Sequence, residues 1–348
     1  MRQKVSAVVT TIGSPVSHIE NLDKLSRQVG GSGLYIVGDD KTPASWSETK
    51  VNFFPIQKQL DSEFGLLANL LPRNHYSRKN LGYLFSVLSG DEWIYETDDD
   101  NYLTLAEGFQ SFFNEPYSLT EFKDNSWVNV YSDFYPKSEL NEDLFIWPRG
   151  FPLDLLPMGN KVEAIGSFET NFDDVLLFNG LVDNDPDVDA IYRLTHSLPA
   201  TFSRKNHLVV LSKDAISPFN SQNTMWHKSL LPLMYLPITT SFRVTDILRS
   251  YIANVLILNS GKSIAFSSPN AVQYRNEHDL LDDLDQEFLL YLKARDLVDL
   301  IKANASGNLT QSDNMWNVYS SLLKDGYVKD EEMRSLEVWL TACKSTLV

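Results

Sequence analysis

Apolar runs alternate with helix-like segments through the first part of the chain. Four runs are rich in β-branched or aromatic residues and are closely followed by a proline, a glycine or an acidic residue; they cover residues 5–11, 34–37, 51–54 and 93–97. Such runs, separated by helices, are typical of βαβ units around a buried, mostly parallel sheet. Leu81, Leu84, Phe85 and Leu88 recur at the spacing of one helix face, which predicts a helix just before the fourth run.

The pattern changes twice farther along the chain. Thr104-Leu105-Ala106-Glu107 has the form of a capping box and predicts the start of another helix. From about residue 127 to 268, short strands at 127–131, 207–211 and 263–266 lie among proline-rich loops, with one helix over about 244–258. From about residue 277 the spacing is helical, with a polar break at 304–308 and two helices after it. We therefore predict an α/β domain over residues 1–276 and a C-terminal helical region over residues 277–348.

Composition narrows the class of protein. Of the 348 residues, 43% are hydrophobic and 12% aromatic, as in a globular protein. The formal net charge of -16 argues against binding to nucleic acid or to an anionic membrane through bulk charge. The single Cys343 suits a reducing compartment. The sequence shows neither a signal peptide nor an apolar run of the roughly 18–20 residues that span a membrane. We expect a cytoplasmic protein without an integral membrane segment, and peripheral association stays open.

An acidic cluster, Asp98-Asp99-Asp100, follows the run at 93–97. Three consecutive carboxylates repel one another, and fold stability gives no reason to place them at the end of a buried strand. Mg²⁺ or Mn²⁺ would remove the repulsion, because both ions prefer carboxylate oxygens. In open α/β sheets, ligands bind beyond the carboxyl ends of the strands. The cluster therefore predicts a metal-dependent ligand site; the alternative is an acidic turn that caps the next helix.

A basic helix start lies upstream of this cluster. Ser77 is a candidate N-cap, which places Arg78, Lys79 and Asn80 in the first turn. Cations there oppose the helix dipole, but the same helix end attracts a phosphate. Gly82 inside the helix indicates a close approach to its backbone. We take Arg78 and Asn80 as candidate diphosphate-binding residues, against the alternative of a solvated basic turn.

Six motifs in this order resemble the STELLO family of glycosyltransferase-like proteins: RKNLGY, YETDDDN, WPRGFPL, GLVDNDPDVDAIYRL, NSQNTMW and SFRVTDILRSYIA. The DDD cluster and the GL-x-x-x-x-PD-x-D run are also similar to reversibly glycosylated polypeptides, the UDP-arabinopyranose mutases. The resemblance covers roughly residues 5–280 and leaves the helical tail out. It implies a GT-A-like, Rossmann-like fold with a central mixed sheet and flanking helices. Plant STELLO proteins carry an N-terminal membrane anchor, which we do not expect from these residues.

The resemblance also implies roles for the acidic cluster and for two sites near the first strands. Asp98 would contact the ribose or bridging waters, Asp99 would belong to the same donor-binding cluster, and Asp100 would coordinate the metal on the diphosphate. Either Asp39 or Asp40 would hydrogen-bond the base or ribose, and Thr10 and Thr11 would flank the base. The alternative for the Asp39-Asp40 pair is a turn before Lys41-Thr42-Pro43.

Candidate residues in the second half are fewer. By the same resemblance, Asp246 would face the acceptor as general base, and His278 would be a third metal ligand. Their alternatives are an ordinary acid in a first helical turn and a surface histidine. Alternating carboxylates resemble a calcium loop but lack the glycine and distal glutamate of an EF-hand, so we reject that interpretation and expect one or two to contact donor-sugar hydroxyls; they are Asp183, Asp185, Asp187 and Asp189.

The sequence thus predicts a metal-dependent glycosyltransferase of the hexosyl- or pentosyltransferase kind. It would use Mn²⁺ or Mg²⁺ and a nucleoside-diphosphate sugar, UDP-linked, with a glycan acceptor. Two alternatives remain, a sugar-nucleotide mutase of the arabinopyranose-mutase type and a non-catalytic scaffold for a polysaccharide synthase. A scaffold has no need for intact Asp98, Asp100, Arg78 and Asn80, so their presence counts against that alternative. Ser260-Gly261-Lys262-Ser263 ends like a P-loop, but Leu256 stands where its first glycine is required.

Overall fold

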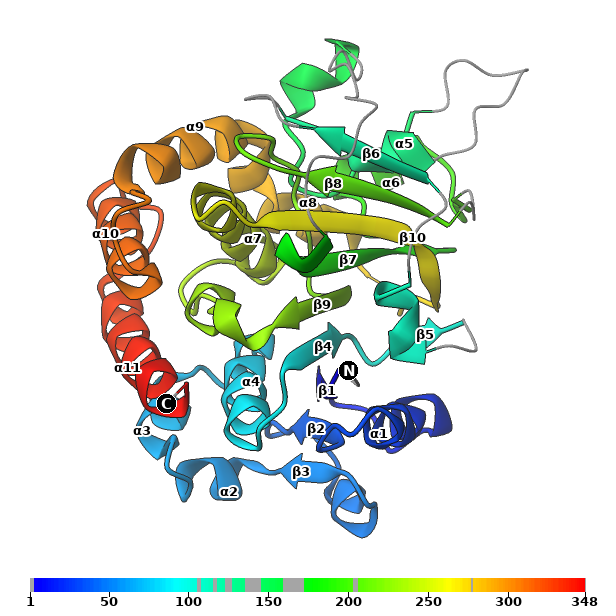
Figure 1. Cartoon of the computed structure of the whole chain (residues 1–348), viewed down its shortest axis with the longest axis vertical. Helices are drawn as coiled ribbons and strands as arrows, with labels where there is room; N and C mark the ends of the chain where they lie inside the picture. Colours follow the sequence, from blue (N-terminus) through cyan, green and yellow to red (C-terminus); the bar gives the residue numbers. More distant parts are fainter. Residues whose placement is uncertain are drawn as a thin grey trace.

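The computed structural model describes residues 3–104, 108–114, 118–122, 127–134, 145–158, 172–202, 206–276 and 278–347. Within these ranges the chain builds one ten-stranded sheet in the order β3-β2-β1-β4-β9-β7-β10-β8-β6, with β5 paired to β10 (Figure 1). The strands are β1 (Val5–Thr10), β2 (Leu34–Val37), β3 (Asn52–Phe54), β4 (Trp93–Thr97), β5 (Asn101–Leu103), β6 (Ser118–Phe122), β7 (Val175–Asp183), β8 (His207–Leu211), β9 (Asn223–His227) and β10 (Ser263–Gln273).

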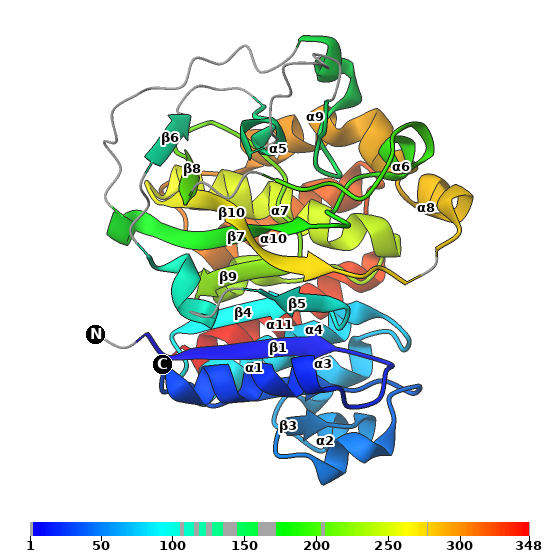
Figure 2. The ribbon, with the colours of Figure 1, turned by 90° about the vertical axis from the view of Figure 1, so that its right-hand side faces the viewer.

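The sheet is mixed, and the change of direction falls beside β4. Strands β3, β2, β1 and β4 are parallel to one another, as the sequence predicts for the first half. Strand β9 then runs antiparallel to both β4 and β7, and β10 is parallel to β7 but antiparallel to β8 and β5. Figure 2 shows β1, β4, β9, β7 and β10 following one another through the molecule. The predicted α/β fold with a central mixed sheet and flanking helices is confirmed.

Helices cover both faces of this sheet. The α-helices are α1 (Ser17–Gln28), α2 (Ile56–Leu60), α3 (Gly65–Leu70), α4 (Lys79–Leu88), α5 (Val130–Phe134), α6 (Ala190–Thr195), α7 (Phe242–Asn259), α8 (Leu280–Gln286), α9 (Phe288–Asn304), α10 (Gln311–Lys324) and α11 (Asp330–Thr346). The 3-10 helices are η1 (Ala44–Glu48), η2 (Tyr76–Arg78), η3 (Gly108–Phe112), η4 (Leu153–Met158), η5 (Phe172–Asp174) and η6 (Lys228–Met234).

Alternate residues of β1 enter two different cores. Val8 belongs to the core cluster that contains residues of α4, whereas Ala7 and Val9 belong to the cluster that contains residues of α1. A strand buried on both faces reads as a continuous apolar run, which is why the sequence reveals it without alternation.

The predicted strand at 127–131 is wrong. Trp127 forms an isolated bridge with Ile216, and the chain then enters α5. Val130, Tyr131 and Phe134 are the buried residues of that helix, so their spacing fits a helix face as well as a strand. The strand predicted at 263–266 extends to Gln273 as β10. Residues 105–107 of the predicted capping box lie outside the described residues.

The C-terminal helices follow one another along the face formed by α7 and α4 (Figure 1). Helix α9 packs against α7, α10 against α9 and η6, and α11 against α3 and α4. Leu297, Val318 and Trp339 join the same core cluster as Leu84 and Leu248. The predicted break near residue 304 and the two helices after it are confirmed. The division at residues 276 and 277 stays a prediction. Across the described ranges, every helix is too short or too polar to span a bilayer.

Candidate functional site

One cavity of about 430 Å³ opens at the carboxyl ends of β1, β2 and β4. The start of α7 and the end of β10 form its opposite wall. Because parallel strands end at the same edge of a sheet, residues that are far apart in the sequence meet there. Most of the residues predicted from the sequence line this cavity, namely Thr10, Thr11, Asp39, Arg78, Asp98, Asp99, Asp100, Asp246 and His278. The predicted residues that do not line it are Asp40, Asn80 and the alternating carboxylates Asp183, Asp185, Asp187 and Asp189.

The three carboxylates of the acidic cluster have different partners. Lys79 Nζ lies 3.2 Å from Asp98 Oδ1 and donates to the Thr97 carbonyl, and this lysine is fully buried. The hydroxyl of Thr11 donates to Asp99. The Gln273 amide donates to both oxygens of Asp100, at 2.9 and 3.0 Å. Among the described residues, Lys79 is therefore the one cation that forms an ion pair with any of the three carboxylates.

Burial disfavours ionisation of Asp98 and Asp100. Burial raises the pKa of Asp98 to about 7, and Asp100 adds to the rise while Lys79 opposes it. Burial also raises the pKa of Asp100, against the hydrogen bond from Gln273. The Asp98 side chain is nevertheless 42% exposed, so it is open to a ligand in the cavity. A divalent cation would favour the ionised form of both carboxylates.

The donor set fits an ion that is shared with a ligand. Within the described ranges no three His, Cys, Asp or Glu side chains are grouped closely enough to hold a metal by themselves. Mg²⁺ is usually bound in nucleotide sites by one or two carboxylates together with phosphate oxygens, and Asp98 and Asp100 would supply such a pair. His278 lines the same cavity but is 38% exposed, with Nδ1 3.4 Å from Asp283. Its role as a metal ligand stays a prediction.

Asp39 and His75 are neighbours on the wall near β2. Asp39 accepts hydrogen bonds from the backbone amides of His75 and Asp40. Nδ1 of His75 accepts from the Ser77 amide at 3.1 Å, so the proton of the neutral ring lies on Nε2. Burial lowers the pKa of His75 to about 4, and its Nε2 has no hydrogen-bond partner among the described residues. Asp40 instead forms an exposed ion pair with Arg73.

The basic helix start is built differently from the sequence prediction. His75, rather than Ser77, caps the first turn, and η2 precedes α4. All the N–H groups of Arg78 have acceptors within the protein, because it donates to the Gln59 side chain and to backbone carbonyls of Ala68, Leu71 and Pro72. The guanidinium therefore fixes the wall of the cavity. Its function as a diphosphate ligand stays a prediction.

Asn80 is paired with the backbone of Leu236. Its amide nitrogen donates to the Leu236 carbonyl and its carbonyl oxygen accepts from the Leu236 amide, both at 2.9 Å. Both groups of the side chain are thus engaged away from the cavity.

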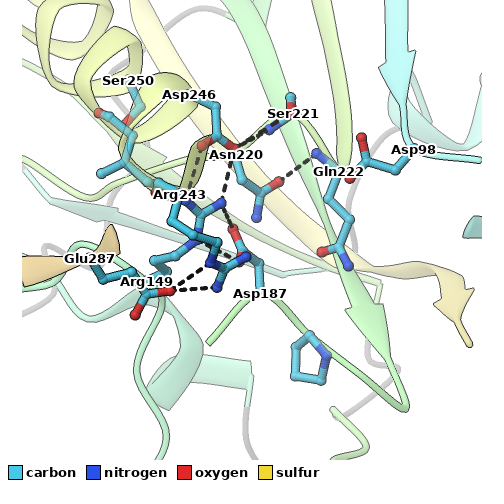
Figure 3. A network of polar contacts seen from close by, with 12 residues as sticks. Asp98, Arg149, Asp187, Asn220, Ser221, Gln222, Arg243, Asp246, Ser250 and Glu287 are labelled. Carbon is cyan, nitrogen blue, oxygen red and sulfur yellow. Dashed lines mark hydrogen bonds and ion pairs between the residues drawn. The ribbon is translucent and has the colours of Figure 1, made fainter. Parts of the chain in front are cut away.

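Arg149 is the centre of a buried network on the opposite wall (Figure 3). It donates to both oxygens of Asp187, each at 2.8 Å, and to both oxygens of Asp246, each at 3.0 Å. It also donates to the Arg243 carbonyl. Sequence reasoning assigned no role to Arg149, although it lies in WPRGFPL and precedes Gly150, whose φ is +86°. Gly150, directly after Arg149, is the one local feature of the sequence that indicates an unusual backbone conformation at this position.

These contacts place Asp246 in a charged network. Besides Arg149, its Oδ2 accepts from the Ser221 amide at 3.2 Å. The Tyr76 hydroxyl accepts from the Asp246 amide and donates to the Phe242 carbonyl. Both carboxylate oxygens of Asp246 are thus engaged within the protein. The predicted general-base function therefore requires Arg149 to release Asp246.

Each of the four alternating carboxylates has a partner within the fold, and none lines the cavity. Asp183 accepts from the Phe202 amide, Asp185 pairs with Arg193, Asp187 pairs with Arg149, and Asp189 caps α6. They support the loop after β7 that approaches the cavity wall.

Comparison with known proteins finds sequence similarity to STELLO glycosyltransferases. A family model described as STELLO glycosyltransferases matches residues 243–347. The curated Arabidopsis thaliana protein "Probable glycosyltransferase STELLO1" is 23% identical over 355 residues, covering 96% of this chain and 43% of the relative. "Probable glycosyltransferase STELLO2" of the same organism is 26% identical over 288 residues, covering 77% and 35%. The chain is thus similar in sequence to STELLO glycosyltransferases.

Two points about this similarity follow. The chain spans less than half the length of these relatives. The family match begins at the start of α7 and includes α8 to α11, so the expectation that the helical tail lies outside the resemblance is wrong. Among solved structures, glucosyl-3-phosphoglycerate synthase from Mycobacterium tuberculosis, in complex with phosphoglyceric acid, is 10% identical with a TM-score of 0.38, covering 94% of this chain and 81% of that one. Similarity of this degree does not bear on activity.

Proposed function

We propose that the chain transfers a sugar from a UDP-linked donor to a glycan acceptor with the help of Mn²⁺ or Mg²⁺. The observation that supports this proposal is the cluster Asp98 to Asp100, which lines the cavity with one buried lysine as its cationic partner. Such an arrangement is unfavourable without a cation and suited to a cation that carries a diphosphate. The relation to STELLO glycosyltransferases supports glycosyl transfer as the reaction class.

The donor would lie along the edge of β1, β2 and β4. Thr10, Thr11 and Asp39 line the part of the cavity that suits the nucleoside, and Asp98 and Asp100 would hold the metal. A divalent cation bound between these carboxylates and the diphosphate would neutralise the negative charge of the nucleoside diphosphate as it leaves. The role of the carboxylates is to fix that position before the sugar bond breaks.

Arg275 is a further candidate for contact with the diphosphate. It lines the cavity, and it acts on Asp100 electrostatically, lowering that carboxyl's pKa against the effect of burial. Burial and the neighbouring Arg193 and Arg243 lower the pKa of Arg275 itself to about 10. Arg275 also pairs with Asp283 at 2.9 Å, but its Nε has no hydrogen-bond partner among the described residues. An anionic ligand would offset the repulsion from the neighbouring cations. We therefore add Arg275 to the residues that bind the donor.

Isothermal titration of UDP in the presence of Mn²⁺ tests the donor site. We expect binding that EDTA abolishes and that Asp100→Ala weakens by roughly tenfold or more, as for loss of a charged contact. Asp325→Ala, an exposed carboxylate at the end of α10, is the matched control and should change nothing. Equal affinity in wild type, Asp100→Ala and EDTA-treated protein would refute the metal-dependent site. Mass spectrometry of products from UDP-sugars, with and without glycans, then separates transfer from interconversion of the donor.

A further inference from the structure

A short segment connects η6 with α7 and is held from both sides. We call residues 235–241 the strap. On one side, Asn80 of α4 makes the paired backbone hydrogen bonds to Leu236. On the other side, Glu332 of α11 contacts the next part of the strap. Figure 1 shows η6 and the adjoining chain between α4 and the C-terminal helices. Two elements more than 240 positions apart in sequence thus fix one segment.

Glu332 is fully buried, and within the described residues it accepts hydrogen bonds from neutral donors of the strap. Its carboxylate accepts from the Tyr235 hydroxyl at 2.7 Å and from the Ile238 amide at 3.0 and 3.1 Å. It also accepts from the Thr239 amide at 2.9 Å and from the Thr239 hydroxyl at 2.7 Å. A buried carboxylate that binds backbone amides in this way is specific for one backbone geometry, because loss of a bond leaves an unsatisfied polar group.

The strap leads directly into the cavity wall. Phe242, Arg243 and Asp246 lie in the first turns of α7 and line the cavity. Tyr76 connects the same turns to the loop before α4, because its hydroxyl bonds to Phe242 and Asp246. A displacement of the strap would therefore move this wall relative to Asp98 and Asp100, which follow β4 and whose partners, Lys79 and Gln273, lie outside the strap.

We infer that Glu332 is a positioning residue for the transfer site: through the strap, it sets the place of the α7 wall opposite the acidic cluster. The inference rests on the proposed function for its effect on transfer. It gives the C-terminal helix, whose sequence carries no candidate chemistry, a part in the arrangement of the site.

Glu332→Gln tests the inference, because glutamine keeps the volume but can accept on one oxygen only. We expect hydrogen exchange measured by mass spectrometry to rise by about tenfold or more in residues 236–246, and to stay unchanged in β1 and β4. Turnover with the UDP-sugar and acceptor found by the product screen should fall by about tenfold or more, whereas the Kd for UDP with Mn²⁺ should change by less than about threefold. Glu331→Gln, the exposed neighbouring residue, is the matched control.

The outcomes separate the inference from the proposed function. If wild type neither binds UDP nor transfers sugar, the proposed function fails, and the exchange experiment still tests the hold of Glu332 on the strap. Unchanged exchange in 236–246, or faster exchange with normal turnover, overturns the inference. Should Glu332→Gln not fold, Thr239→Val removes one donor to the carboxylate and should shift exchange and turnover in the same direction by a smaller factor.

Discussion

At the scale of single residues, Arg149 holds the carboxylates of the opposite cavity wall in place. Its five N–H groups are engaged by Asp187, Asp246 and the Arg243 carbonyl. Two carboxylates on one guanidinium leave a net negative charge, and Asp246 contributes to the raised pKa of Asp98. The network therefore works as a fixed anionic support whose position depends on Arg149.

The substitution Asp246→Asn distinguishes a structural role of Asp246, as a partner of Arg149, from a role as general base. Asparagine keeps one acceptor for Arg149, and Asp246 is already bonded through both oxygens, so we expect turnover to fall by less than about tenfold with the donor Kd unchanged. Steady-state kinetics with UDP titration measures both. Asp187→Asn, which alters the same arginine outside the cavity lining, should give a similar result. A loss of roughly two to four orders of magnitude for Asp246→Asn alone would establish the general base that the sequence predicts.

His75 makes stability depend on pH. Its folded pKa of about 4 lies below the ordinary 6.5, because the ring is buried. Between these values the unfolded chain binds the proton and the folded chain does not, so stability falls as the pH is lowered from 6.5 to 4. The loss at pH 4 should be roughly 1–3 kcal/mol. Urea unfolding at several pH values should show this slope in wild type and a smaller slope in His75→Asn, which can still cap Ser77. Equal slopes would contradict the assignment.

At the scale of elements, Gly82 of α4 lies where the helix packs closely against the sheet. A Cβ on Gly82 would lie 2.4 Å from Val8 Cγ1 and 2.9 Å from Val37 Cγ2. The close approach that the sequence predicted is therefore real, but the neighbours are β1 and β2 rather than a ligand. Helix α4 must lie this close to the two strands for its N-terminal residues to reach the cavity edge.

Gly82→Ala should destabilise the protein despite its better helix propensity. The gain in propensity is about 1 kcal/mol, whereas overpacking against two β-branched residues costs about 1–3 kcal/mol. We expect a net loss of up to about 2 kcal/mol in urea unfolding, together with weaker UDP binding if α4 shifts outward. Stability equal to or above that of wild type would show that Val8 and Val37 give way freely.

At the scale of the whole molecule, the helical tail and the sheet share a core. Leu297, Val318 and Trp339 belong to the cluster that also holds α4 and α7. Glu332 adds polar contacts from the tail to the strap. The boundary predicted after residue 276 thus crosses continuous packing.

A chain that ends at residue 276 tests that boundary. Removal of the tail exposes the apolar faces of α7 and η6, so we expect loss of the cooperative unfolding transition and aggregation. Calorimetry and size-exclusion chromatography compare the shortened and full chains. A cooperative transition, accompanied by UDP binding, would establish residues 1–276 as an independent domain.

Local pattern was sufficient for much of the fold. The strands at 34–37, 93–97 and 207–211 and the helices α4 and α7 follow from runs whose type and length agree with their spacing. The strand prediction for residues 127–131 was wrong because the apolar residues there fit the spacing of a helix as well as that of a strand. Contacts with the rest of the chain select the helix. For the site, residues at the ends of parallel strands could be predicted, because topology alone brings those ends to one edge.

The sequence by itself determined the parallel half of the sheet and the acidic cluster at its edge, whereas the metal and the diphosphate as ligands of that cluster stay predictions. It did so because strand periodicity and consecutive charges are local properties of the chain. Tertiary structure alone decided that Arg78 and Asn80 have partners within the fold, that Arg149 holds Asp246, and that Glu332 fixes the strap. Each of these depends on a hydrogen bond between residues distant in sequence, and a side chain's type does not reveal whether it meets a ligand or another part of the same chain.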